Sequence, residues 1–328
     1  MDAVVRRLLP FFPLLGLCAC EGPQSVLDPA GRDAEVLATL FWIMLGGAIF
    51  LWVALNGLIH FVTRIAPRPL NRRAAEALII GGGVVFPVIL LAALLAYALS
   101  EMPRQRDRGE GLRVEVTGHQ FWWRVHYWPD GAEAPIVSAN EVRLPTGQRS
   151  EITLNAERVI HSFWIPALGG KTDMIPGRET RMSLEPTKPG EYRGQCTEFC
   201  GESHAYMAFG AVVMETEAFE AWLEREAAPA VAPASEEARR GAELFLSEGC
   251  GGCHAVRGTE AEGQVGPDLT HLASRVSLAA GILPMTEDAL RDWVRDPAQF
   301  KPGVEMPGYD HLSDEELSAL SAYLGGLE

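Results

Sequence analysis

Residues 196–207 read Cys-Thr-Glu-Phe-Cys-Gly-Glu-Ser-His-Ala-Tyr-Met, so two thiols, an imidazole and a thioether lie within twelve positions. Thiolate, thioether and imidazole ligands together are typical of copper sites in proteins. In an oxidising compartment two nearby cysteines more commonly form a disulfide, which is the competing interpretation. A disulfide leaves the histidine and the methionine without a role, so the stretch favours a copper site.

A further ligand can come from His161, which apolar residues flank at the end of a predicted strand in residues 159–164. Two thiolates, two histidines and one methionine are too many ligands for one blue-copper ion, but they fit two coppers that share both sulfurs. The backbone carbonyl of Glu198 can complete the second copper. An electron shared over two metals changes each metal–ligand bond little, which suits a one-electron relay. Mononuclear zinc would leave the methionine unexplained.

The residues around this stretch have the pattern of an all-β domain. From residue 112 to about residue 223 short runs alternate apolar and polar side chains, as in Glu151-Ile152-Thr153-Leu154. Turn signals such as Pro145-Thr146-Gly147 and Lys188-Pro189-Gly190 recur between these runs. The pattern predicts a β-sandwich or barrel over 112–223.

A second constellation, Cys250-Gly251-Gly252-Cys253-His254, is the attachment sequence of a c-type haem. Its two thiols bond to the haem, and its histidine is the proximal iron ligand. We predict Met306 as the distal ligand because it lies in a Pro- and Gly-rich loop, residues 301–308. Met285, at the start of a predicted helix, is the rival. A short disulfide or a zinc site is the competing interpretation of the cysteine pair.

The residues around the haem motif have a helical pattern, with leucines at positions 317, 320 and 324. This pattern predicts an all-α domain over 239–328. Residues 224–238 contain a run rich in Ala and Pro without apolar periodicity. Such a composition predicts an extended, semi-rigid linker between the two soluble domains.

The N-terminal hundred residues hold the longest apolar stretches. Residues 1–20 carry Arg6 and Arg7 near their start, continue with an apolar run and end in small residues, which is the pattern of a secretory signal. The ending also resembles a lipoprotein cleavage box in which Cys20 would carry the lipid, with an ordinary signal or an uncleaved anchor as the alternative. Within 36–100, two stretches at about 37–62 and about 77–99 exceed the roughly 20 residues that cross a bilayer. We therefore expect a two-helix transmembrane hairpin.

Charge predicts how this hairpin is oriented. Arg64, Arg68, Arg72 and Arg73 lie in the short loop between the apolar stretches. The positive-inside rule then predicts a cytoplasmic loop, with both chain ends on the periplasmic (extracytoplasmic) side of a bacterial plasma membrane. The chain has a formal net charge of −15, and we expect no nucleic-acid partner. The acidic surface either steers a basic donor protein or simply maintains solubility.

Four stretches resemble subunit II of bacterial haem-copper cytochrome c oxidases: residues 118–123, 159–164, 171–178 and 196–207. The resemblance runs from the hairpin to the end of the β domain and implies a cupredoxin-like barrel with a dinuclear copper centre, CuA. The implied copper ligands are His161, Cys196, the carbonyl of Glu198, Cys200, His204 and Met207. The resemblance also implies that the Glu198 side chain helps to bind a magnesium ion shared with subunit I.

The tail resembles the class I cytochrome c domain of caa3-type oxidases, with haem c on Cys250, Cys253, His254 and Met306. The expected fold is therefore multi-domain: a two-helix transmembrane hairpin, an all-β cupredoxin-like barrel and an all-α cytochrome c domain. The resemblance implies that electrons enter from cytochrome c or another donor through haem c, pass to CuA and continue to subunit I. There oxygen would be reduced to water, coupled to proton pumping.

The implied partners are subunit I, which carries haem a, haem a3 and CuB, and subunit III. This chain cannot reduce oxygen alone, because His161, His204 and His254 are already assigned among its eight histidines and only His60 lies in a span. A membrane-anchored electron-transfer protein that serves another acceptor, such as nitric oxide reductase, is the alternative. Subunit II of a quinol oxidase shares the fold but lacks the metal ligands.

Two positions depart from the family pattern. Phe121 stands where the family often has the tryptophan that receives electrons from soluble cytochrome c, and Trp122 and Trp123 follow it. Simple packing is the alternative role for these aromatic side chains. We expect the tethered haem to approach the copper centre by a different route. Glu76 lies near the start of the second span, where the family often has a glutamate at a proton-channel mouth, but its spacing to Pro87 is one turn longer than usual. An interfacial charge is the alternative.

Overall fold

The computed structural model describes residues 21–65, 70–102, 107, 109 and 112–328. The predicted signal at 1–20, with Cys20, lies outside the described residues, as does Arg68. The chain divides into two compact units. One is residues 35–107, and the other contains the soluble part from residue 112 onward together with the N-terminal stretch up to Ala34.

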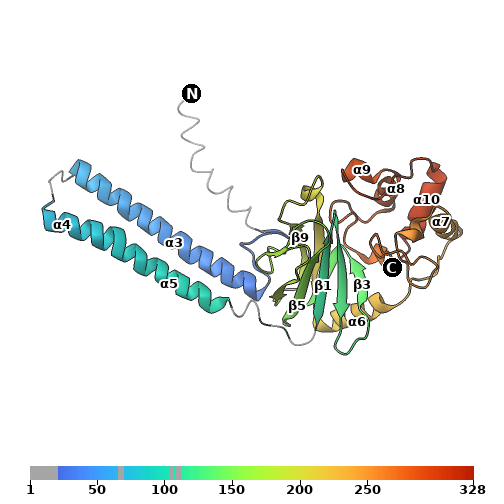
Figure 1. Cartoon of the computed structure of the whole chain (residues 1–328), viewed down its shortest axis with the longest axis horizontal. Helices are drawn as coiled ribbons and strands as arrows, with labels where there is room; N and C mark the ends of the chain where they lie inside the picture. The colour runs from blue at the N-terminus through green and yellow to red at the C-terminus, as the bar shows by residue number, and fades with distance from the viewer. Residues whose placement is uncertain (1–20, 66–69, 103–106, 108, 110–111) are drawn as a thin grey trace, which may run out of the picture. The chain divides into compact units, whose positions relative to one another are not determined.

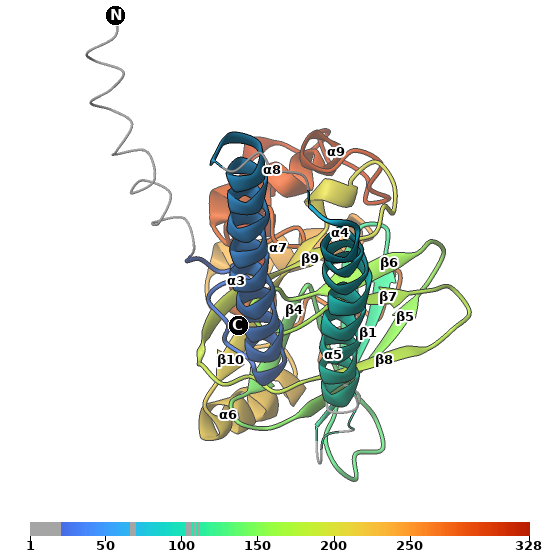
Figure 2. The same ribbon diagram turned by 90° about the vertical axis from the view of Figure 1, so that its left-hand side faces the viewer.

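The smaller unit is a helical hairpin. Helix α3 spans Arg32–His60 and continues as the π-helix η2, Phe61–Ile65; the return arm joins α4, Arg72–Ala77, η3, Leu78–Val85, and α5, Phe86–Glu101. Figures 1 and 2 show the two arms running side by side. The arms extend beyond the predicted limits of 37–62 and 77–99, because helical structure includes the polar residues that flank each apolar stretch.

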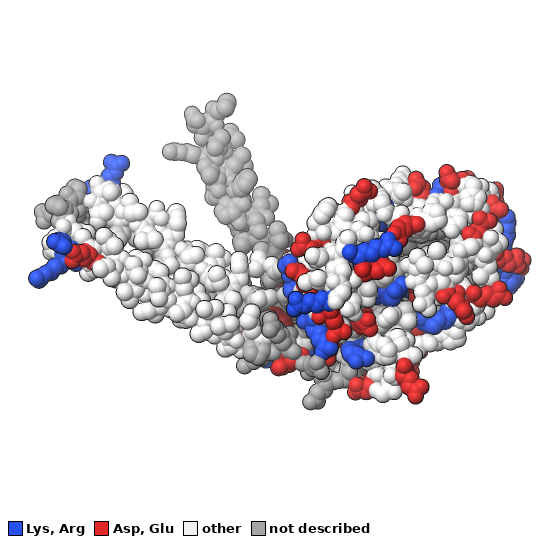
Figure 3. Space-filling view, viewed as in Figure 1, with Lys and Arg blue, Asp and Glu red and all other residues white. Residues whose placement is uncertain are grey.

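Most side chains of the hairpin are exposed, and none in η2, α4, η3 or α5 is buried. Apolar side chains on all sides of a helix suit a lipid environment rather than water. In Figure 3 the hairpin surface is almost free of charge except at its loop end, where the blue side chains gather. Both arms are long and apolar enough to cross a membrane.

The β domain contains ten strands among the described residues, in two five-stranded sheets. The first sheet has the order β3-β2-β1-β5-β8 and the second β4-β10-β9-β6-β7. The strands are β1 Arg113–His119, β2 Trp122–Trp128, β3 Ile136–Ala139, β4 Glu141–Pro145, β5 Ser150–Ala156, β6 His161–Trp164, β7 Thr172–Met174, β8 Thr180–Leu184, β9 Gly190–Cys196 and β10 Ala208–Met214.

The core of this domain follows from strand alternation. In β2 every second side chain is buried, which places Trp123 and Tyr127 inside. The Trp123 ring packs edge-on against Phe209 of β10 at 5.1 Å and Phe163 of β6 at 5.9 Å between ring centroids. Edge-to-face aromatic contacts of this kind join the two sheets into one core.

The predicted linker, 224–238, is helical at both ends. Helix α6 spans Thr216–Ala227 and α7 begins at Glu236, so only residues 228–235 are extended. The boundary was misplaced because Glu224, Arg225 and the alanines after them are good helix formers that continue α6. The extended part is not free either, since the Ala230 amide donates to the Arg257 carbonyl at 2.9 Å.

The C-terminal domain is helical. It contains α7 Glu236–Ser247, α8 Glu287–Arg295, α9 Pro297–Phe300 and α10 Asp314–Leu324, with the short 3-10 turns η6 Cys250–Gly252 and η7 Leu272–Ser274. Ser235 caps α7 by accepting the Ala238 amide, and Ser313 forms a capping box with Glu316 at the start of α10. The predicted fold class is therefore confirmed.

The helical and β domains belong to the same compact unit. The C-terminal helical domain is called the haem domain below because it carries the predicted haem motif. Arginines of the β domain donate to its carbonyls: Arg143 Nη2 to Ser274 O at 2.7 Å and Arg193 Nη1 to Gly281 O at 2.5 Å. The buried Glu141 carboxylate accepts the Val276 amide at 2.7 Å. These bonds fix the arrangement of the two domains.

Helices α7 and α10 cross at Gly241, where a Cβ atom would lie 1.9 Å from the Ala319 carbonyl oxygen. Gly241→Val is therefore expected to push the helices apart and lower the free energy of unfolding of the haem domain by about 3 kcal/mol. Thermal unfolding, followed by the haem absorbance, measures the change. Glu243→Ala, on the exposed side of α7, is the control and should change stability little. Equal stability of G241V and wild type would contradict the close crossing.

Candidate metal and haem centres

The sheet itself places the first copper-site residues. His161 is the first residue of β6 and Cys196 is the last of β9, and these strands pair through Phe163 and Cys196. The Cys196 amide donates to the Met207 carbonyl at 2.9 Å and so closes the base of the loop between β9 and β10. Cys200 and His204 lie on this loop. The loop that carries Cys200 and His204 is thus held at its two ends by the paired strands β9 and β10.

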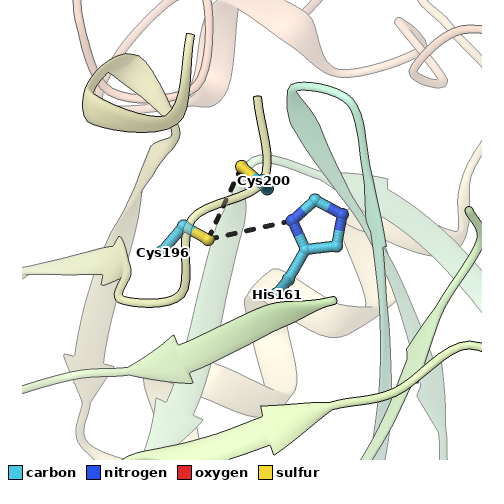
Figure 4. A group of neighbouring side chains, drawn as sticks. All are labelled: His161, Cys196 and Cys200. Carbon is cyan, nitrogen blue, oxygen red and sulfur yellow. Dashed lines mark hydrogen bonds between the residues drawn. The ribbon is translucent and has the colours of Figure 1, made fainter. Parts of the chain in front are cut away.

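All six predicted copper-ligand atoms lie together. Cys196 Sγ is 3.9 Å from Cys200 Sγ, 3.8 Å from His161 Nδ1 and 3.3 Å from the Glu198 carbonyl oxygen. Cys200 Sγ is 3.6 Å from His204 Nδ1 and 3.8 Å from Met207 Sδ. Figure 4 shows both sulfurs and the His161 ring converging on one point. Both histidines present Nδ1 to this group.

The site is enclosed and favours a cation. His161, Cys196, Cys200 and Met207 are all buried. The hydrogen bond between the thiols lowers the pKa of Cys196 and raises the pKa of Cys200, because one proton is retained between the two sulfurs. Both sulfurs can lose their protons only if positive charge replaces that proton. A donor set of two thiolates, two imidazoles, a thioether and a carbonyl fits copper.

The haem motif lines a cavity with mainly apolar walls. Cys250, Cys253, His254 and Met306 all lie on the cavity, whereas Met285 is not among the described residues that line it. The His254 Nδ1–H donates to the Pro267 carbonyl at 2.8 Å, which leaves Nε2 available for iron. Burial lowers the pKa of His254, so its ring favours the neutral form that binds metal. The residues fit a covalently bound haem.

The aromatic segment 121–123 is divided between two environments. Phe121 and Trp122 line the haem cavity, and the Trp122 ring stacks on His119 with a centroid distance of 4.3 Å. Trp123 is instead a core residue, 6.1 Å from the His161 ring. The route of electrons past Phe121 stays a prediction, but the haem cavity adjoins this residue itself. Sequence patterns could not reveal this, because the contact joins two separate domains.

Several residues at the site carried no signal in the sequence. Gln120 lines the haem cavity, and its Nε2 donates to the Cys200 carbonyl at 2.7 Å. Arg275 and Lys301 are buried basic residues on the same cavity. Lone polar residues of these types usually lie at the surface, and only the fold shows that they are buried.

Glu76 lies on α4 of the helical hairpin. Its carboxylate pairs with Arg72 Nε at 2.8 Å, and both side chains are exposed. The pair has the i, i+4 spacing of a helix-surface ion pair. A role in a proton channel stays a prediction.

Replacing the predicted distal ligand, Met306, and its rival, Met285, in turn tests which methionine would bind the haem iron. Met306→Leu is expected to abolish the methionine–iron charge-transfer absorption and lower the haem reduction potential, because a thioether opposite histidine raises it. Met285→Leu, a packing residue of the same domain, should leave both properties unchanged. Optical spectra and redox titration give the result. The opposite outcome would assign the ligand to Met285.

Comparison with known proteins identifies both soluble domains. Residues 129–216 match the family model of the cytochrome c oxidase subunit II periplasmic domain, and residues 238–328 match that of cytochrome c. Cytochrome c oxidase subunit 2 of Alkalihalophilus pseudofirmus is 34% identical, with 98% of this chain and 97% of the relative covered. The Bacillus subtilis protein of the same name is 32% identical over 98% and 96%.

Among solved structures, the periplasmic domain of subunit II of cytochrome oxidase from Bradyrhizobium japonicum shares 31% identity. It covers 37% of this chain and 95% of its own, with a TM-score of 0.34. The two family models and the nearly full-length similarity to the curated relatives lead to one assignment. The chain belongs to the cytochrome c oxidase subunit 2 family, whose members are part of an oxidoreductase complex, and it carries a cytochrome c domain at its C-terminal end.

Proposed function

We propose that this chain is the electron-entry subunit of a caa3-type cytochrome c oxidase. Electrons from cytochrome c or another donor enter at a haem c held by Cys250, Cys253, His254 and Met306. They continue one at a time to a dinuclear copper centre and then to subunit I, where oxygen is reduced to water and protons are pumped. The copper ligands are His161, Cys196, the Glu198 carbonyl, Cys200, His204 and Met207.

The observation that carries this proposal is that one side chain joins the two sites. Gln120 lines the haem cavity and donates a hydrogen bond of 2.7 Å to the carbonyl of Cys200, a proposed copper ligand. The cavity and the paired sulfurs therefore share a wall. A direct approach of this kind supports electron transfer within the chain rather than through a separate carrier.

When bound, the two cofactors would supply reversible one-electron redox chemistry. The protein residues supply the surroundings. Buried Cys196, Cys200 and His161 exclude water, and the apolar walls around His254 do the same for haem. Limited solvent access controls the reduction potential of each centre.

Oxygen chemistry belongs to partner chains. In the described spans the only histidine is His60, which is too few for the haems and copper of the catalytic subunit. Phe199 is 75% exposed beside the His204 ring, and Tyr206 is also exposed. Exposed aromatic side chains at a metal loop suit a protein contact, and we assign this face to subunit I. The half-buried Glu198 carboxylate is our candidate ligand for a shared magnesium ion.

The membrane arrangement follows from the same assignment. The exposed arginines Arg64, Arg72 and Arg73 at the loop end of the hairpin favour the cytoplasmic side for this loop. Both soluble domains then lie on the periplasmic side, and subunits I and III surround the hairpin. A lipid on Cys20 would add a second anchor. Glu76 would then lie on the cytoplasmic side, where a role in proton uptake requires subunit I beside it.

Copper and haem analysis of cysteine variants tests the two centres separately. Purified full-length chain is expected to contain two coppers and one haem c, with a mixed-valence copper signal in electron paramagnetic resonance. Cys200→Ser should abolish that signal and retain the covalent haem, whereas Cys250→Ser should weaken haem attachment and retain the copper signal. A mononuclear copper signal in the wild type would overturn the dinuclear assignment.

The complex itself provides an independent prediction. Gentle membrane extraction should copurify this chain with a large haem-bearing subunit and with cytochrome c oxidase activity. The reason is that this chain lacks the histidines for oxygen reduction. Isolation as a stable solitary chain, or with a reductase for another acceptor, contradicts the assignment to an oxidase.

A further inference from the structure

Lys301 is a buried lysine between the haem domain and the β domain. Its side chain is only 2% exposed, and Nζ donates to the Phe121 carbonyl at 2.7 Å and to the Ala279 carbonyl at 2.8 Å. Phe121 belongs to the β domain, whereas Ala279 belongs to the haem domain. The lysine therefore ties a loop of the haem domain to the segment that walls the haem cavity.

Burying this amine is unfavourable for the fold. Desolvation lowers the pKa of Lys301 to about 7. A methionine of similar length would fill the same space without that penalty. Buried polar groups that cost stability are retained where their geometry is needed. We therefore expect Lys301 to have a role besides packing.

A second hydrogen bond holds the haem-domain loop that contains Lys301, and its donor lies on the loop with the proposed copper ligands. Ser203 is fully buried, and its hydroxyl donates to the Pro302 carbonyl at 2.6 Å. Ser203 precedes the proposed copper ligand His204, and Pro302 follows Lys301. One dipeptide of the haem domain is therefore bonded to both loops that surround the paired sulfurs.

Three loops pack closely together here. They are the β-domain loop with Gln120 and Phe121, the loop 197–207 with the proposed copper ligands (the copper loop), and the haem-domain loop 301–308. A Cβ atom at Gly303 would lie 2.9 Å from the Glu202 carboxylate, and one at Gly201 would lie 3.0 Å from Gln120 Nε2. Gly303 has φ +74°, so the haem-domain loop turns sharply where it meets the copper loop. Met306 follows three residues later. The loop that carries the proposed distal haem ligand is thus seated on the loop that carries the proposed copper ligands.

We propose that Lys301 and Ser203, which we call the clamp, are positioning residues that hold the Met306 loop against the copper loop and so fix the approach of the haem to the copper pair. This inference rests on the proposed function. Arg143 and Arg193 join the domains elsewhere, at Ser274 and Gly281. Loss of the clamp therefore leaves the domains associated but lets the two ligand loops separate.

The test uses the full chain in the assembled oxidase, with variants Lys301→Met and Ser203→Ala. Losing a buried hydrogen bond changes an equilibrium constant by about tenfold, so we expect K301M to slow haem-to-copper transfer by about tenfold and S203A by somewhat less. Transfer is followed optically after flash reduction of the haem. Arg193→Gln removes a cross-domain bond outside the clamp and is the matched control, with an unchanged rate expected.

Hydrogen exchange provides a readout apart from electron transfer. The Lys301 amide is bonded to Pro297 O at 2.9 Å and the Val304 amide to Lys301 O at 3.1 Å. Both amides should exchange faster in K301M and S203A but not in R193Q, because the loop opens locally. The methionine–iron absorption and the copper resonance should persist, which shows that both centres are intact.

The outcomes separate the two proposals. If the wild type transfers no electrons from haem to copper, the proposed function fails. If the wild type transfers them, and K301M and S203A match its rate and its exchange at residues 297–306, the clamp is overturned. Should K301M fail to bind haem, S203A alone decides the question, because it removes one hydrogen bond and no buried charge.

Discussion

Two thiol groups, 3.9 Å apart in a pocket closed to water, set the strongest constraint on this structure. As thiolates they repel each other, and their burial is tolerable only beside concentrated positive charge. The loop that holds these two thiols is confined between the paired strands β9 and β10. The bond from the Cys196 amide to the Met207 carbonyl joins the first and last residues of the loop. Histidine and methionine donors then surround the sulfurs within a short stretch of chain.

The parts of the structure that depend on local sequence were accessible to prediction. Copper-loop residues lie within twelve positions, and the haem motif within five, so their proximity needs no knowledge of the fold. The alternation in β2 likewise indicates which side chains are buried, and the apolar runs of the hairpin indicate segments able to cross a membrane. His161 was the exception, a distant residue that was predicted because the copper site needs a second histidine and apolar residues flank this one at a strand end. Element ends were less predictable, as α6 shows by continuing to Ala227.

The contact between the two soluble domains was not predictable, and the reason is physical. Lys301 bonds to the carbonyl of Phe121, which lies 180 residues away in the sequence. Every residue has a backbone carbonyl, so no residue type marks the acceptor of such a bond. The same holds for Gln120 with Cys200 and for Ser203 with Pro302. Interfaces built from side chains that bond to backbone leave almost no trace in a single sequence.

Phe121 is buried and Trp122 is half-buried, with both facing the haem cavity of the same chain. The helical domain of the same chain covers this surface, so a freely diffusing carrier has no access to it in this arrangement. On the proposed function, the outside donor would then meet the outer face of the haem domain. Donor choice and copper chemistry thereby become separate traits: the outer face can adapt to a new carrier by ordinary surface substitutions, while the residues next to the copper loop stay unchanged.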